Sequence, residues 1–252
     1  MTRSRACSAI SWRISVLSVY HLTLRQLSGR WRVVIMSVLS LMPVIIAMLM
    51  LRDNTAPSVQ QFETTILSTM LAGSIAPLVV LAIAAAAFGD EVEDRTLANL
   101  TLTPIPRWKI ALPKLLATIS IAVPFIAMSA LVTTHVAFLG EWRATIAVTI
   151  AAIAAVAMYA SMFVWLGLVS GQAVGLGLLY IVLWEGFISG FIPGVRLLSI
   201  RHYAIALMNA IDDRRFATTD HLSPAVAVIM ATLVIGGFLL LSIRRLRRMD
   251  VP

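Results

Sequence analysis

Four carboxylates lie close together in one polar stretch of an otherwise apolar chain. They are Asp90, Glu91, Glu93 and Asp94. Clustered carboxylates can hold Mg²⁺, which prefers oxygen ligands, and a membrane enzyme could use such an ion on a phospholipid head group. Enzymes of that class normally repeat their carboxylates at helical spacing, whereas this sequence has one clustered run. A lipid-modifying enzyme that uses residues 90–94 is therefore an alternative interpretation.

Glu185 is the second residue that could do chemistry, because it lies inside a long apolar run. A charged side chain in hydrocarbon costs at least about 2–3 kcal/mol, so such residues usually face protein or water. Roughly 18 Å of helical rise separates Glu185 from Ala173, which places it in the outer half of the bilayer. There it could line a pathway, or serve a secondary transporter as a proton site, although the two similar halves expected of such a transporter are not seen. Alternatively, the helix breaks near Trp184 and leaves Glu185 at the outer interface.

Signatures of known catalytic sites are absent from the sequence. It contains no Gly-rich phosphate-binding loop that ends in Lys and Ser or Thr, no zinc-protease motif and no serine-hydrolase elbow. Its four histidines have no metal-ligand spacing. Its single cysteine, Cys7, cannot form an intrachain disulfide. We therefore expect a non-catalytic chain that itself holds no cofactor and no metal.

The composition is typical of an integral membrane protein. Of the residues, 60% are hydrophobic and only 13% are charged, with a mean hydropathy of +0.92. Apolar runs long enough to cross about 30 Å of hydrocarbon occur repeatedly. The predicted spans are Val33–Leu51, Ile66–Phe88, Leu115–Leu139, Ala144–Leu168, Ala173–Ile192 and Pro224–Ile243. The predicted fold is an all-α membrane protein with one domain over residues 1–252: an arm over 1–32, a six-span bundle over 33–243 and a basic tail over 244–252.

The distribution of Lys and Arg predicts the orientation of the chain. Fourteen basic residues fall on the side that holds the arm, the 90–114 segment and the tail, and six fall on the other side. The positive-inside rule then places both termini and this segment in the cytoplasm of a multi-pass protein in the cell (inner) membrane. The net charge of +8 follows from this topology, and no nucleic-acid-binding motif accompanies it.

The arm before the first span has an amphipathic helical pattern. Its apolar face consists of Val16, Leu17, Tyr20, Leu24 and Leu27. A helix of this kind lies in the plane of the membrane–water interface, with Trp12 and Trp31 as anchors at head-group level. A membrane-surface anchor is the simplest interpretation of this pattern.

The polar segment between the second and third predicted spans predicts a short surface helix. It begins with the acidic cluster, Leu97 and Leu100 follow one helical turn apart, and Pro104 would stop it. Acidic residues favour the start of a helix, where the backbone N–H groups have no partner. The two leucines would pack either against lipid or in a groove of another protein.

This segment resembles the cytoplasmic coupling segment of bacterial ABC exporter permeases of the type-2 family. The matching residues are Glu93, Thr96, Leu97, Leu100, Thr103, Pro104, Arg107, Trp108, Ile110 and Lys114. Arg95 and Pro113 stand where members of the family often carry Gly. The resemblance implies that a separate ATPase subunit contacts the segment. The residues assigned to this coupling are Glu91, Glu93, Asp94, Arg95, Thr96, Leu97, Leu100, Pro104 and Arg107.

The layout of the chain also resembles that family, with an elbow helix in the arm, six spans and a re-entrant or outer helical hairpin over 195–222. The resemblance implies two permease copies and two separate ATPase subunits, which bind the ATP and Mg²⁺. These would export a hydrophobic or amphipathic substrate by alternating access. Glu185, Gly186 and Gly190 are then pathway or structural residues. Gly186, Gly190 and Gly194 also have the spacing of close helix contacts.

Overall fold

The computed structural model describes residues 16–52, 66, 71–93, 106–138, 140–189, 198–212 and 222–248. Every regular element in these ranges is a helix. Five helices are long and apolar enough to cross a membrane, so the expected all-α membrane architecture is confirmed. They are α2 (Arg30–Arg52), α4 (Ala76–Glu93), α6 (Trp108–Ala137), α7 (Trp142–Val169) and α11 (Pro224–Arg248). A π-helical turn over residues 71–75 precedes α4.

These five helices coincide with five of the predicted spans. The remaining one, Ala173–Ile192, corresponds to a shorter apolar helix made of α8 (Ala173–Leu179) and the π-helix η2 (Tyr180–Ile188). This helix is short, as the interface interpretation of Glu185 expected, although it continues past Trp184 to Ile188. Residues 190–197 lie outside the described ranges, and the count of six spans stays a prediction.

Helices α4 and α7 form the centre of the bundle. Most of their membrane-spanning length is buried, whereas α2 and α11 expose most of theirs. A Cβ atom at Gly167 of α7 would lie 2.7 Å from the backbone oxygen of Ala85 on α4, so the two backbones approach closely only because residue 167 is glycine. At Gly186, by contrast, no other described helix of the chain lies within 4 Å of the Cβ position. Gly190 and Gly194 lie outside the described ranges, so close helix contact through these three glycines stays a prediction.

Helix α1 (Val16–Leu27) is the helix predicted in the arm, and it packs on α6. Its Tyr20 hydroxyl donates a hydrogen bond to Ser120 Oγ of α6 at 2.9 Å. Thr23 and Leu27 are buried, but Leu17 is 65% exposed. The buried side of α1 therefore differs from the predicted apolar face, because α1 contacts protein along only part of that face.

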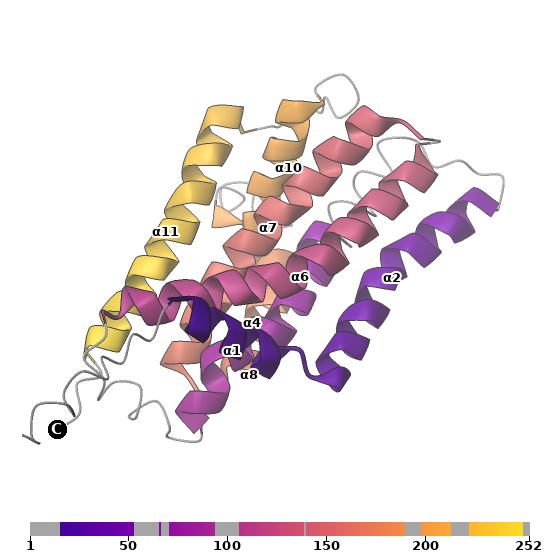
Figure 1. The fold of residues 1–252 in the computed structure, drawn as a ribbon. Coiled ribbons are helices and arrows are strands. Elements are labelled where there is room, and N and C mark those ends of the chain that lie inside the picture. Colours follow the sequence, from indigo (N-terminus) through magenta and orange to yellow (C-terminus); the bar gives the residue numbers. More distant parts are fainter. Residues whose placement is uncertain are drawn as a thin grey trace, which may run out of the picture.

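Figure 1 shows which elements share an end of the bundle. The helix α1 and the C-terminal end of α11 lie towards one end, and α10 (Ile200–Ile211) lies at the other. This arrangement agrees with the predicted layout, in which the arm and the tail lie on one side and residues 195–222 on the other. The first end also contains the end of α4 and the start of α6, which flank the predicted coupling segment.

Candidate functional site

The end of α4 and the start of α6 differ from the sequence prediction. Helix α4 continues through Asp90, Glu91 and Glu93, so these acids belong to the end of a span. The prediction that they open a new surface helix is wrong for residues 90–93, and residues 94–105 lie outside the described ranges. Helix α6 begins at Trp108, well before the predicted start at Leu115. As a consequence, Lys114 lies inside a helix and not in a loop.

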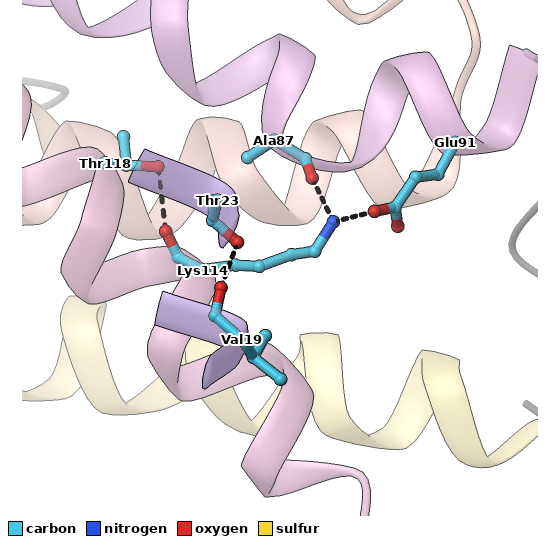
Figure 2. A network of polar contacts seen from close by, with 6 residues as sticks. All are labelled: Val19, Thr23, Ala87, Glu91, Lys114 and Thr118. Carbon is cyan, nitrogen blue, oxygen red and sulfur yellow. Dashed lines mark hydrogen bonds and ion pairs between the residues drawn. The ribbon is translucent and has the colours of Figure 1, made fainter. Parts of the chain in front are cut away.

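Lys114 and Glu91 join these two helices. Lys114 Nζ lies 2.6 Å from Glu91 Oε1, and it also donates a hydrogen bond to the backbone oxygen of Ala87. The ammonium group lies 4.3 Å from the ring centroid of Phe88, within cation–π range. Figure 2 shows the Lys114 side chain extending from α6 to the last turns of α4. We call Lys114, Glu91 and the Ala87 carbonyl the clamp.

The clamp explains how acids are tolerated at the end of α4. The C-terminus of a helix carries a partial negative charge, so carboxylates are unfavourable there. Lys114 offsets this with a full positive charge supplied by the next span. Only 3% of the Lys114 side chain and 16% of the Glu91 side chain are exposed. Removing one partner of so buried a pair costs about 3–5 kcal/mol, because the other charge is left without compensation.

A third element, α1, meets α4 and α6 beside the clamp. On α1, the buried Thr23 hydroxyl donates a hydrogen bond to the backbone oxygen of Val19 at 2.8 Å. On α6, Thr118 Oγ1 donates to the backbone oxygen of Lys114 at 2.9 Å. Figure 2 draws both bonds with the ion pair. The Thr23 hydroxyl thus bonds within α1, whereas the Tyr20 hydroxyl links α1 to α6.

The clamp brackets the predicted coupling segment, although most of that segment is not described. The coupling residues outside the described ranges are Asp94, Arg95, Thr96, Leu97, Leu100 and Pro104. Glu93 lies at the end of α4, and Arg107 precedes α6, where its backbone oxygen accepts the Ile110 N–H at 3.1 Å. The sequence analysis gave Lys114 no role in the site. A lysine at the start of an apolar run, with acids at the end of the run before it, is the pattern that could have indicated the ion pair.

A second carboxylate, Glu185, is fully buried beside α10. Its Oε1 atom accepts hydrogen bonds from Tyr159 Oη, Tyr180 Oη and the Ile200 N–H, each at 3.1 Å. Its Oε2 atom accepts one from Ser199 Oγ at 2.6 Å. Four donors on one carboxylate offset the loss of its hydration. We call Glu185 and these four donors the outer cluster.

The outer cluster fastens the start of α10 to other elements. The Ile200 N–H belongs to the first turn of α10, where backbone donors lack intrahelical partners, so Glu185 caps this helix from η2. Tyr159 comes from α7, and its hydroxyl also lies 3.3 Å from the backbone oxygen of Ala72, in the turn before α4. A single hydroxyl hydrogen serves one acceptor well at a time, so this bond can exchange between Glu185 and Ala72. The π-helical form of η2 is itself frequent at functional positions.

Further contacts hold α10 in place. Ser189 Oγ accepts a hydrogen bond from Arg201 at 3.1 Å and donates one to the backbone oxygen of Glu185 at 2.9 Å. At the other end of α10, Arg143 at the start of α7 lies 3.7 Å from the Asp212 carboxylate. Both ends of α10 are therefore tied to the bundle, the first through buried groups and the second through a largely exposed arginine.

The described residues do not support a metal centre. Within these ranges, no three His, Cys, Asp or Glu side chains lie together as metal ligands. Glu91, one of the four candidate Mg²⁺ ligands, is paired with Lys114. Asp94 lies outside the described ranges. The side chains of Asp90 and Glu93 are not described either, so the lipid-modifying enzyme stays an untested alternative.

Comparison with known proteins identifies a family. A family model described as "ABC-2 family transporter protein" matches residues 24–200 of the chain, which include both the clamp and the outer cluster. No curated protein matches the chain.

Proposed function

The chain belongs to the ABC-2 transporter family, and from this premise we propose that residues 91–107 couple it to ATPase subunits. The chain is a multi-pass membrane component of an ABC transporter. Members of this family associate with ABC ATPase subunits and are generally not catalytic themselves. The proposal concerns how this chain is coupled to its ATPase, in which direction it transports and what it transports.

The observation that carries the proposal is the clamp. About a dozen residues outside the described ranges join α4 to α6. The clamp connects the two helices beside the two ends of this segment. Without such a connection, a force on the segment could change the shape of the segment without moving α4 and α6. With the clamp, a push on residues 94–105 moves the ends of α4 and α6 together.

The packing of α4 supports transmission from the clamp into the bundle. Helix α4 lies at the centre and touches α7 closely at Ala85 and Gly167. Helix α7 carries Tyr159 of the outer cluster, and the turn before α4 supplies the backbone oxygen of Ala72. A movement of α4 along its axis would therefore alter the outer cluster and, through it, the position of α10.

In the proposed arrangement, the whole chain forms one transmembrane domain with six spans in the inner membrane. Both termini are cytoplasmic, α1 is an elbow helix beside the ATPase, and α10 belongs to a re-entrant or outer hairpin. Two permease copies and two ATPase subunits export a hydrophobic or amphipathic substrate by alternating access. ATP and Mg²⁺ bind to the ATPase subunits. The basic asymmetry of the sequence and the shared end of α1 and α11 support this topology.

Co-purification with an ATPase subunit from the native host tests the coupling role. We expect Glu93→Lys and Leu100→Ala to lower the amount of bound ATPase while the permease stays in the membrane at its normal level. Loss of the Leu100 side chain alone removes roughly 1–3 kcal/mol of apolar burial. Arg245→Glu, in the last turn of α11, is the matched charge control on the same side of the membrane. Full ATPase association in both segment variants would refute the coupling assignment.

Cysteine labelling in a Cys7→Ser background tests the topology separately. We expect a cysteine at position 100 to react with an impermeant maleimide only after the membrane is opened. A cysteine at position 205 should react with the same reagent in intact cells. Labelling of position 100 from outside intact cells would reverse the orientation and remove the basis for ATPase contact.

A further inference from the structure

The last turns of α11 carry four exposed arginines, which we call the arginine patch. They are Arg244, Arg245, Arg247 and Arg248. Ser242 and Leu246 of the same turns are buried against the bundle, so the arginines spread over the side of α11 that faces away from it. Within the described ranges, none of the four makes an ion pair or a side-chain hydrogen bond.

The length of α11 places the arginine patch at the level of the lipid head groups. About 20 residues, or roughly 30 Å of helical rise, separate Pro224 from Arg244, and the hydrocarbon of a bilayer is about 30 Å thick. Helix α6 contacts α11, and Figure 1 shows the start of α6 beside the end of α11. Trp108, at this start, is exposed, and tryptophan is enriched at the membrane–water interface. The arginine patch therefore lies where the phosphates of a phospholipid leaflet lie.

The arginine patch also continues the lipid-facing side of α11. One turn before it, Leu240 is 59% exposed and Leu241 is 41% exposed. Residues four and seven positions apart lie on the same side of a helix. The four arginines stand at these positions after the two leucines, so that two parallel stripes change from apolar to basic. A phospholipid changes from acyl chain to phosphate at the same level, whereas a water-soluble partner would match only the basic part.

The spacing of the arginines leaves an electrostatic cost that a bound anion would relieve. Three pairs within the patch are like-charged at i,i+3 or i,i+4 spacing, which destabilises a helix. The negative end of the helix dipole is equivalent to about half a charge, so one cation is enough to offset it. A guanidinium group binds phosphate through two parallel N–H donors. A phosphate held between neighbouring arginines thus supplies the charge that the described residues do not.

We propose that the arginine patch binds the head group of an anionic phospholipid, whose phosphate bridges the guanidinium groups while its acyl chains lie along Leu240 and Leu241. The lipid belongs to the leaflet at the end of the bundle that contains α1. Binding needs neither ATP nor an ATPase subunit, because the arginine patch takes no part in the clamp.

Competition between two lipids tests the proposal on the purified full chain in detergent. The chain is mixed with equal amounts of phosphatidylglycerol, which is anionic, and phosphatidylcholine, and the first bound lipid is identified by native mass spectrometry. We expect a preference for phosphatidylglycerol of at least about tenfold. The double variant Arg244→Gln, Arg248→Gln should lose most of this preference, about tenfold, because each basic residue at the surface contributes separately. Both side chains are exposed, so circular dichroism should show an unchanged fold.

Two further variants separate a phosphate site from general attraction by charge. Arg25→Gln, Arg30→Gln removes two exposed arginines from the same end of the bundle, but they stand on different helices and should leave most of the preference intact. Arg244→Lys, Arg248→Lys keeps the charge and loses the paired donors, so its preference should fall between those of the parent and the glutamine variant. A phosphatidylglycerol with a photoactivatable group beside its phosphate should label peptides from the end of α11.

Three results would overturn the proposal. Equal loss of preference in the Arg25 and Arg30 variant and in the Arg244 and Arg248 variant would show diffuse attraction and no site on α11. Displacement of the lipid by inorganic phosphate would show a site for a soluble anion, since acyl-chain contacts would then add nothing. Unchanged lipid preference in the Arg244→Gln, Arg248→Gln variant would remove the lipid site, and loss of the ATPase from the same variant would assign the arginine patch to a protein contact.

Discussion

Glu91 and Glu185 lie towards opposite ends of the bundle, and the two carboxylates are compensated in different ways. At one end of the bundle, Glu91 is paired with a full charge, the Lys114 ammonium, across two helices. At the other, Glu185 accepts hydrogen bonds from three hydroxyls and one backbone N–H, contributed by several elements. The first arrangement has one strong contact, and the second has several weaker, directional ones.

The two kinds of compensation predict different movements at the two ends of the bundle. An ion pair screened from water is lost or kept as a unit, because separating its two charges leaves both without compensation. We therefore expect the clamp to stay closed during transport, so that α4 and α6 move together. In the outer cluster, the Tyr159 hydroxyl lies within hydrogen-bonding distance of both Glu185 and Ala72. We expect this region to rearrange by exchange of partners while Glu185 stays satisfied.

The largest effect is expected from breaking the clamp. Lys114→Met removes the cation and leaves Glu91 buried without compensation, which should destabilise the chain by about 3–5 kcal/mol. Thermal unfolding in detergent, followed by circular dichroism, measures the loss. The double variant Lys114→Met, Glu91→Leu replaces the whole pair by apolar groups and should recover most of the stability. A double variant as unstable as Lys114→Met would show that the pair itself does not account for the loss.

A smaller effect is expected in the outer cluster. Glu185→Gln keeps the shape of the side chain but turns one acceptor oxygen into an NH₂ group, which cannot accept the hydrogen bond that this oxygen receives in the parent. We expect a loss of about 1–3 kcal/mol and earlier exchange of the α10 amides in hydrogen-exchange mass spectrometry, with the amides of α6 near Lys114 unaffected. Equal deprotection at both ends of the bundle would contradict the separation of the two sites.

The contact between α4 and α7, which lies between the two carboxylates along the bundle, can be altered with a single methyl group. Gly167→Ala would place its Cβ 2.7 Å from the Ala85 backbone oxygen, so the helices must separate, at an expected cost of about 1–2 kcal/mol. Gly175→Ala, where no atom lies within 4 Å of the Cβ position, is the matched control and should be neutral in thermal unfolding. If the two variants unfold at the same temperature, the close approach of α4 and α7 does not contribute to the stability of the bundle.

The smallest effect is expected at α1. Tyr20→Phe removes the hydrogen bond to Ser120, which is exposed to the surroundings, and should cost at most about 1 kcal/mol. Co-purification of the ATPase should be unchanged, because the clamp does not depend on this bond. A marked loss of ATPase from the Tyr20→Phe complex would move the coupling role from the clamp to α1.

Much of the fold could be predicted because apolar runs of spanning length are a local property. The five long helices and α1 follow from such runs and from helical periodicity. The acids at 90–93 were assigned to the wrong end of a helix, because their compensation comes from Lys114 on the next span and is not local. Glu185 was recognised as the ionisable residue of a span, but its partners Tyr159 and Ser199 lie far from it in sequence. Most of the coupling segment lies outside the described ranges and stays a prediction.

The claim that the clamp carries force between the coupling segment and the spans can be tested by replacing it with a reversible covalent link. In a Cys7→Ser background, Glu91→Cys and Lys114→Cys are bridged by a short membrane-permeant bis-methanethiosulfonate, and ATP hydrolysis is measured in the complex with its ATPase subunits. We predict parent-like activity when the bridge is present and loss of most activity after its reduction. Parent-like activity of the reduced variant, or inactivity of the bridged one, would contradict the account.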